Sequence, residues 1–248
     1  MRVSDISVTA PQSFLRFTAL LVSRRFKTLR TSVMSAIKQA ALAALAVAAI
    51  STTAHAQTTD QWFVHAGPAL VAPDESATMT AGGQAVPGAN VSIDSRWTFE
   101  GEIGRYLTRN VAIAVAAGYP PTFTVKTAGS LSGLGTAGQM TGGPAGILLQ
   151  YHFNREGRIQ PYVGAGASFL VVFGTKDGVM TDLKAKSAMG TALQVGSDFM
   201  LNDRWGAFID VKKAWVGTLA TGSMGPNPVR AKVNVDPLVT NMGVTYHF

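Results

Sequence analysis

The sequence predicts an all-β protein, an eight-stranded antiparallel transmembrane β-barrel with short periplasmic turns and long extracellular loops. Three observations lead to this prediction. Segments of about ten residues alternate apolar and polar side chains, the connections between them are alternately short and long, and an export signal precedes them all. A tilted strand of about ten residues spans a hydrocarbon layer. Beyond the export signal no apolar run is long enough for a membrane-spanning helix, so a closed barrel is the remaining way to satisfy the backbone in lipid.

Residues 1–56 have the composition of a targeting segment. They hold seven of the 21 Lys and Arg residues but only one acidic residue. An apolar run of eleven residues precedes Ala54 and Ala56, which form an A-x-A motif, so we expect signal cleavage after Ala56. Met34 stands where a signal peptide of ordinary length begins. Translation therefore starts there or at Met1, and we favour Met34.

The exported part, residues 57–248, is nearly neutral although the whole chain has a net charge of +7. Removing the charges of residues 1–56 leaves 14 basic and 13 acidic residues. A nucleic-acid partner requires a basic stripe on the folded part, so we expect none. The chain has no cysteine, so an exported fold must gain its stability from a core or from the membrane rather than from disulfides.

Eight segments have the period-2 alternation of strands with one apolar face. In the third segment, for example, Val111, Ile113 and Val115 share one face and alanines occupy the other. The residues opposite the apolar faces are mostly small, as the narrow interior of an eight-stranded barrel requires. The predicted strands span 61–71, 95–106, 110–119, 141–153, 160–173, 186–201, 204–217 and 235–248.

The last predicted strand ends its apolar face on two aromatic residues, Tyr246 and Phe248. Aromatic residues gather at both membrane interfaces of outer-membrane barrels. We expect these two residues to belong to such a girdle and to form the C-terminal signal for the outer-membrane assembly machinery. The other expected girdle residues are Trp62, Trp97, Tyr119, Tyr151, Phe153, Trp205 and Trp215.

The lengths of the connections strengthen the barrel prediction. Short and long connections alternate strictly along the chain, which is typical of outer-membrane barrels with tight periplasmic turns and long external loops. Soluble barrels and sandwiches have no reason to separate loop lengths in this way. The short connections are 107–110, 154–157 and 202–203, and the long ones are about 72–94, 120–140, 174–185 and 218–234.

Several motifs resemble those of the outer-membrane protein W (OmpW) family. They are Leu148–Asn154 (LLQYHFN), Gln160–Gly166 (QPYVGAG), Val235-Asp236-Pro237 and the terminal Tyr-x-Phe. The resemblance covers about 61–248. It implies an eight-stranded barrel with a narrow hydrophobic interior that passes small apolar molecules, with a related subgroup that takes up alkanes. It also implies a side opening between the third and fourth strands. The long loops here are poorer in charge and richer in Gly, so the resemblance does not identify the substrate.

The residues around the third and fourth strands give independent grounds for a lateral opening. Pro120 and Pro121 end the third predicted strand, and Gly142, Gly143 and Pro144 begin the fourth. Each proline removes a ladder donor, so the outer ends of the two strands cannot pair fully. Prolines that merely mark where strands leave the bilayer would give the same pattern.

Five charged residues fall on the faces opposite the apolar ones: Glu100, Glu102, Asp198, Asp210 and Lys212. Charges that faced lipid would cost several kcal/mol each, so we expect them inside the barrel. They line either a hydrophilic pore or a mutually paired polar plug. We favour the plug, because eight strands leave no wide channel and buried charges must pair.

Enzymatic functions find little support. Some small outer-membrane barrels modify lipids with a Ser–His–acid set, but His65, His152 and His247 lie away from the outer loops and no such set follows from their spacing. Metal-ligand spacing is absent, and the Gly164-x-Gly166 motif lies inside a strand, unlike nucleotide-binding motifs. We therefore expect no enzyme, no cofactor and no metal.

The sequence as a whole indicates an integral outer-membrane barrel that passes small hydrophobic solutes passively and contacts outer-membrane lipids. The alternative is a closed structural or adhesive barrel whose loops bind ligands or partners. Apolar residues in the loops, such as Val86, Val125 and Leu131, fit a solute entrance and a docking surface equally well.

Overall fold

The computed structural model describes residues 62–248. The expected signal peptide, with Ala54 and Ala56, lies outside the described residues. Within 62–248 no helix is long and apolar enough to cross a membrane. The strands are β1 (Trp62–Ala72), β2 (Ser76–Ala81), β3 (Gln84–Ala85), β4 (Ala89–Ile93), β5 (Arg96–Tyr106), β6 (Val111–Gly118), β7 (Thr122–Gly129), β8 (Thr136–His152), β9 (Ile159–Asp177), β10 (Thr181–Ala185), β11 (Ala188–Met200), β12 (Trp205–Trp215), β13 (Gly217–Met224), β14 (Asn227–Asn234) and β15 (Leu238–His247).

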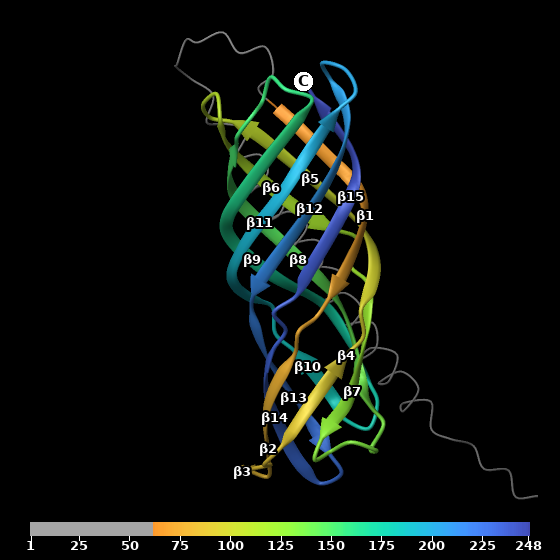
Figure 1. Ribbon diagram of the computed structural model, residues 1–248. Helices are drawn as coiled ribbons and strands as arrows, with labels where there is room; N and C mark the ends of the chain where they lie inside the picture. Colours follow the sequence, from red (N-terminus) through yellow and green to blue (C-terminus); the bar gives the residue numbers. More distant parts are fainter. Residues whose placement is uncertain (1–61) are drawn as a thin grey trace, which may run out of the picture. The chain divides into compact units, whose positions relative to one another are not determined.

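Eight of these strands close into an antiparallel barrel, as the alternation predicted (Figure 1). Their order around the barrel is β1, β5, β6, β8, β9, β11, β12 and β15, and β15 pairs with β1 to complete the ring. The closing ladder runs from Phe63 opposite His247 to Ala72 opposite Leu238. A closed ring leaves no edge strand, so the backbone groups of the barrel wall find their partners within the protein.

The barrel is apolar on the outside, the reverse of a soluble protein. On β15, Leu238, Met242 and Val244 are 40–50% exposed, whereas Asn241 and Thr245 are fully buried. An exposed apolar band around a polar interior is the arrangement that a lipid solvent stabilises. The predicted aromatic residues lie on this outer surface. At the periplasmic end, Trp205, Tyr246 and Phe248 form a chain of ring contacts 4.5–4.8 Å apart, measured between ring centroids.

The long connections are not loops, which corrects the expectation for them. Residues assigned to the external loops form strands β2, β3, β4, β7, β10, β13 and β14 and the outer ends of β8 and β9. Five of these strands make a second sheet in the order β10, β13, β14, β2, β3, while β7 and β4 extend the wall at β8. The sequence carries this signal in the alternation of β14. There, Val229, Ala231 and Val233 are buried, whereas Arg230 and Lys232 are exposed.

The strands beyond the barrel enclose an apolar interior, here called the outer apolar core. It joins residues of the external strands to residues at the outer end of the barrel, so the two regions share one continuous core. Its buried members are Ala69, Val71, Met79, Ala89, Val91, Ile93, Phe123, Ala137, Met140, Leu170, Met180, Val216, Val229, Ala231, Val233, Val235 and Val239.

Closure of the barrel depends on two glycines that face each other across β1 and β15. A Cβ on Gly243 would lie 2.2 Å from the backbone oxygen of Ala66, and a Cβ on Gly67 would lie 1.9 Å from that of Met242. We expect Gly243→Ala to lower the free energy of unfolding by roughly 3 kcal/mol, the upper range for overpacking. Denaturant unfolding of the reconstituted barrel, followed by tryptophan fluorescence, measures this loss.

The matched control is Gly101→Ala on the neighbouring strand β5. A Cβ on Gly101 would lie 4.0 Å from its nearest neighbour, the backbone oxygen of His65. We expect the stability to change by less than about 0.5 kcal/mol there. Equal stability of the two variants would contradict the account of the closing seam.

Candidate functional site

The barrel interior holds a cluster of buried polar side chains below the outer apolar core. We call it the polar plug. Its members come from seven of the eight barrel strands, all but β6, so it fills the lumen rather than lining one wall. They are His65, Glu100, Glu102, Tyr106, Gln150, His152, Tyr162, Gln194, Asp198, Asp210, Lys212, Asn241 and His247.

Lys212 is the central cation of the plug. Its Nζ donates hydrogen bonds to Glu100 Oε1 at 2.8 Å and to both carboxylate oxygens of Asp210 at 2.9 Å. The same Nζ lies 3.5 Å from Glu102 Oε2. Asn241 Nδ2 donates a further hydrogen bond to Glu100 Oε1 at 3.3 Å. Three carboxylates from two sides of the barrel therefore converge on one ammonium group, and they are its counterions.

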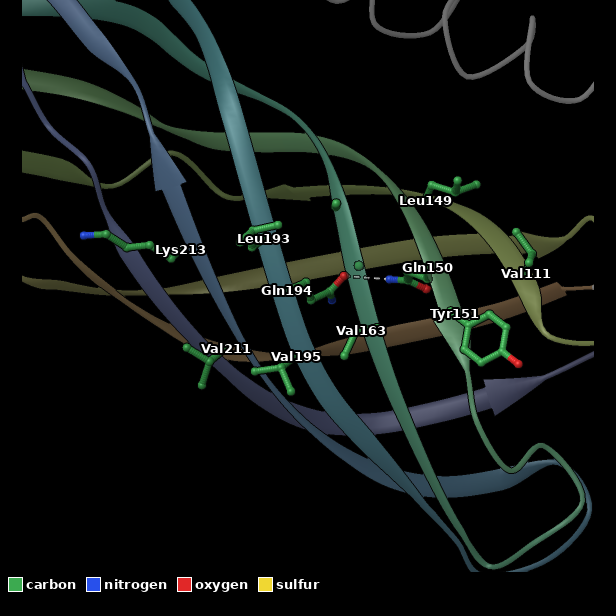
Figure 2. A pocket seen from close by; sticks show the side chains of 12 residues that line it. Val111, Leu149, Gln150, Tyr151, Val163, Leu193, Gln194, Val195, Val211 and Lys213 are labelled. Carbon is green, nitrogen blue, oxygen red and sulfur yellow. Dashed lines mark hydrogen bonds between the residues drawn. The ribbon is translucent and has the colours of Figure 1, made fainter.

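Two glutamines connect the carboxylates to one another. Gln150 Nε2 donates to Glu102 Oε1 at 2.8 Å. It also donates to Gln194 Oε1 at 2.8 Å, as Figure 2 shows. Gln194 Nε2 donates to Glu102 Oε2 at 3.2 Å and to Asp210 Oδ2 at 3.1 Å. Tyr162 adds its hydroxyl to Asp210 Oδ2 at 3.3 Å. These neutral donors add hydrogen bonds to the carboxylate oxygens around Lys212, as buried charges require.

The periplasmic half of the plug is built on histidines around Asp198. His65 Nε2 lies 3.0 Å from Asp198 Oδ1, and His247 Nε2 lies 3.3 Å from Asp198 Oδ2. His65 Nδ1 also lies 3.3 Å from Glu102 Oε1, so His65 links the two halves of the plug. At the periplasmic mouth, the Arg155 guanidinium lies 3.5 Å from the centroid of the Tyr106 ring.

Glycines in the barrel wall make this packing possible. A Cβ on Gly164 would lie 3.0 Å from Gln194 Oε1 and 3.2 Å from Gln150 Cγ, so the glycine clears the space in which the two amides meet. A Cβ on Gly196 would lie within 2.6 Å of both Tyr162 and Asp210. The Gly-rich PYVGAG segment therefore serves the packing of the plug.

The five charged residues predicted to face inward all lie in the plug. Asp198 occupies the histidine-rich half, and Glu100, Glu102, Asp210 and Lys212 occupy the half around the lysine. The sequence argument did not identify the neutral members as part of the plug. They are Gln150, Tyr162, Gln194 and Asn241. Each lies on the inward-facing side of its strand, where its neighbours on that side are mostly small residues.

One group in the plug has the donor types of a metal site. Ligand atoms of His65, Glu102 and Asp210 lie within 4.8 Å of one another. The Lys212 ammonium lies against two of these three residues and already supplies the positive charge that a cation would bring. The described contacts of the three histidines go to Glu102, Asp198, Gln150 and Tyr106 inside the plug, which is not a nucleophile–base arrangement.

Above the plug, the outer apolar core contains a cavity of about 50 Å³. Apolar side chains from both external walls line most of it, among them Met79, Ile93, Met140, Met180 and Val233. A second cavity of about 30 Å³ lies at the boundary with the plug. Its lining includes Glu100 and Lys212 on one side and the Pro144–Gly146 wall segment on the other.

The wall next to this second cavity has an interrupted ladder. β6 pairs with β8 as far as Ala117 opposite Ala145, and β7 resumes the pairing at Thr122 opposite Thr141. Between these points the segments 118–121 and 142–144 share one backbone hydrogen bond, from Gly142 N to the Pro121 oxygen at 3.1 Å. We call this stretch the proline seam. It contains all five residues predicted for a lateral opening, Pro120, Pro121, Gly142, Gly143 and Pro144.

The proline seam differs from the expected gap between strand ends, because pairing resumes beyond it. The other edge of β8 stays paired with β9 at Gly143 opposite Val171 and Pro144 opposite Leu170. A Cβ on Gly143 would lie 3.6 Å from Pro121 Cδ, so the two segments lie close together and leave room for about one carbon atom between them. The seam is thus a closed contact that lacks most of its hydrogen bonds, since prolines have no N–H to donate.

Comparisons with known proteins agree with this architecture. The family model described as the OmpW family matches residues 58–248. The chain is 33% identical to outer membrane protein AlkL of Ectopseudomonas oleovorans over 175 residues, which cover 71% of this chain and 76% of that protein. It is 31% identical to the dibenzothiophene metabolism operon protein PahQ of Pseudomonas aeruginosa over 187 residues, 75% of this chain and 88% of that protein.

The fold is also that of a solved structure, the outer membrane protein OprG of Pseudomonas aeruginosa. The two superpose with a TM-score of 0.71 at 24% identity, over 76% of this chain and 96% of OprG. The family match spans the whole described barrel, and both AlkL and OprG are named outer membrane proteins. This chain therefore belongs to the OmpW family of outer-membrane barrels.

Proposed function

We propose that this barrel mediates passive passage of small hydrophobic molecules into or across the outer membrane, with lateral release at the proline seam. The observation that carries the proposal is the order of the regions inside the barrel, taken along its axis from the outer end. A continuous apolar core lies at the outer end, a polar plug lies below it, and the weakest stretch of wall lies beside their boundary.

The polar plug argues against a straight path through the lumen. A solute that entered it would have to separate Lys212 from its carboxylates, and breaking a buried ion pair costs roughly 3–5 kcal/mol. An apolar solute offers no hydrogen bonds in return. Small hydrophilic solutes meet the same barrier, because their passage also requires the plug to come apart.

The proline seam offers a less costly path. Opening a fully paired stretch of wall breaks backbone hydrogen bonds that have no water to replace them. Between 118–121 and 142–144 only the bond from Gly142 to Pro121 is present, so few are lost on opening. The cavity beside Pro144 lies next to this stretch. An apolar molecule that leaves here enters hydrocarbon, which is a favourable solvent for it.

Passage of a solute requires side chains of the outer apolar core to move. A cavity of about 50 Å³ is far smaller than the roughly 300–1,000 Å³ of pockets that hold a small-molecule ligand. Three methionines, Met79, Met140 and Met180, line the cavity, and their unbranched side chains repack easily. This mobility suits a conduit for varied apolar solutes better than a binding site for one of them.

The comparisons support the solute class only by analogy. One relative is named for a dibenzothiophene metabolism operon, and dibenzothiophene is an apolar aromatic compound. The proposal assigns no catalytic residue and no cofactor. The competing proposal is a closed structural or adhesive barrel with partner-binding loops, and uptake measurements separate the two.

The first prediction compares cells with and without the protein. We expect an apolar solute such as an alkane to enter several-fold faster when the barrel is present, and a small sugar to enter at an unchanged rate. The apolar core accepts the first solute and the plug excludes the second. Equal acceleration of both solutes would indicate a water-filled pore. Acceleration of neither would favour the structural barrel.

The second prediction concerns the proline seam. Replacing Pro120 and Pro121 together by Thr restores two N–H donors, so we expect the seam to pair and uptake of the apolar solute to fall toward that of cells without the barrel. The control is Pro161→Thr, on β9 opposite Ser197 and outside the proline seam. Unchanged uptake by the double variant would contradict lateral release at this seam.

A reversible version of the same test uses the absence of native cysteine. A Cβ on Gly143 lies 3.9 Å from Pro120 Cα, so Pro120→Cys with Gly143→Cys brings two thiols within reach of each other. Oxidation should stop apolar uptake and reduction should restore it in the same cells. Uptake that is indifferent to oxidation, with the disulfide verified by mass spectrometry, would count against the seam.

The third prediction concerns the polar plug as a barrier. Lys212→Met leaves Glu100 and Asp210 without their cation, so we expect the free energy of unfolding to fall by roughly 3–5 kcal/mol. Lys213→Met removes a partly exposed ion pair with Asp74 and should cost less than about 1 kcal/mol. Denaturant unfolding in lipid compares them. Equal losses would show that Lys212 is not the central cation of the plug.

A further inference from the structure

Four cations form an ordered array on the outer face of the external sheet. They are Lys184 on β10, Lys186 directly after it, and Arg230 and Lys232 on β14. All four side chains are exposed, and the residues that alternate with them, Leu183, Ala185, Ala231 and Val233, point to the outer apolar core. We call these four residues the basic array.

Strand register places the four cations in two adjacent rows. In one row Lys184 pairs with Thr221, which pairs with Arg230, which pairs with Thr80. In the next row toward the barrel, Lys232 pairs with Leu219 on one side and Thr78 on the other. Lys186 adjoins Leu219, whose backbone oxygen accepts its N–H at 3.2 Å.

The register also gives the size of the array. Lys184 and Arg230 stand two strands apart, as do Lys186 and Lys232. Neighbouring strands lie about 4.8 Å apart and two residues along a strand span about 6.8 Å. The cations therefore stand at the corners of a rectangle of roughly 10 by 7 Å. Hydroxyl groups of Thr78, Thr80 and Thr221 lie within the two rows.

The basic array has no internal counterions. Some exposed cations elsewhere on the described surface are paired, as Arg96 is with Asp94 and Lys213 with Asp74. Within residues 62–248 none of the four array side chains makes an ion pair or a hydrogen bond. Four like charges held on a rigid sheet repel one another, so the array favours binding of an external anion.

The array lies just beyond the outer membrane interface. Leu219 follows the exposed Trp215 by four residues, and Lys186 precedes the exposed Met189 by three. At about 3.3 Å per residue, the lower row stands roughly 10–13 Å from this apolar band. Figure 1 shows β10, β13, β14 and β2 together beyond the end of the barrel. The phosphates and first sugars of outer-leaflet glycolipids occupy this height.

We propose that the basic array binds the phosphate groups of the glycolipid that forms the outer leaflet around the barrel. Each phosphate offers several acceptor oxygens to ammonium and guanidinium donors. The exposed apolar residues below the array face the acyl chains of the same molecule. The proposal is independent of the solute path, because the array lies on the outside of the wall and the path on the inside.

The compact shape of the array distinguishes this ligand from a soluble polyanion. A linear polyanion is bound by cations that follow one another along a stripe. Here the four cations form a closed rectangle, and the half-buried Leu219 sits in the lower row between Lys186 and Lys232. An apolar side chain inside the array suits contact with a lipid headgroup region.

The test compares two double variants that each remove two positive charges. Arg230→Gln with Lys232→Gln halves the basic array. Lys126→Gln with Lys176→Gln removes two exposed cations from β7 and β9 on the other wall, and is the control. The purified barrel in neutral detergent is titrated with lipopolysaccharide that carries its lipid A phosphates, and bound glycolipid is measured by its hydroxy fatty acids.

We expect the array variant to raise the apparent Kd for the glycolipid about 25-fold at low ionic strength. Each of the two removed cations contributes roughly 5-fold to binding near an anionic surface. The control variant should bind like the unmodified protein. The difference should shrink in high salt, which screens exposed charges. Mobility of the unboiled protein on an SDS gel verifies that each variant is folded.

Four results would overturn the proposal. The first is an equal Kd for the array variant and the control variant. The second is equally tight binding of the same glycolipid after its phosphates have been removed. The third is loss of heparin binding in the array variant while lipopolysaccharide binding is unchanged, which would assign the array to a soluble polyanion. Displacement of the glycolipid by millimolar inorganic phosphate would likewise overturn it in favour of a free-phosphate site, whereas persistence of binding supports it.

Discussion

Water is absent from the hydrocarbon layer, so the backbones of β1 and β15 must find their hydrogen-bond partners in the protein itself. That requirement explains why the strands form a closed ring. The closed ring in turn determines the width of the lumen and how side chains pack inside it. Eight strands leave a lumen that side chains can fill. The narrowness explains the glycines that face inward, such as Gly164 and Gly196, because the plug side chains occupy the space that their Cβ atoms would need. The close approach at Gly67 and Gly243 is a further consequence of joining the last strand to the first.

The polar plug follows from the same narrowness. Side chains on the inner face cannot reach lipid, and a lumen of this width holds no bulk water, so every inward charge has to be satisfied by another side chain. Four carboxylates share one lysine, two histidines and the amides of Gln150 and Gln194. The amides matter because they donate to carboxylates without adding charge. The result is a barrier made of mutual hydrogen bonds, which a passing solute cannot replace.

Much of this architecture was predictable from the sequence, because lipid on one side and a filled lumen on the other impose a strict period of two. That period locates the eight barrel strands to within a few residues on most of their ends, and it places Glu100, Glu102, Asp198, Asp210 and Lys212 inside. Most external strands were missed because they are short and their apolar residues are few and lie among Ser, Thr, Asn and Gly; the alternation of β14 is the exception. The neutral plug residues were missed because a glutamine such as Gln150 has a small free-energy cost near an interface whether it faces the lumen or the lipid. Only its contacts reveal its role.

The proline seam is tolerable because its two sides are secured elsewhere. β9 holds the far edge of β8 from Gly138 to His152, and β7 resumes pairing beyond Pro121, so the loss of donors stays local. Below the seam the plug is held by charges, and beside it the outer core is held only by apolar packing. An apolar molecule in that core therefore meets two boundaries of different strength. The lower boundary is a network of buried ion pairs whose disruption costs several kcal/mol. The lateral boundary is a close approach of two segments with one backbone hydrogen bond, and hydrocarbon lies beyond it. Under the lateral release that we propose, the difference between these two costs sets the direction in which a solute leaves.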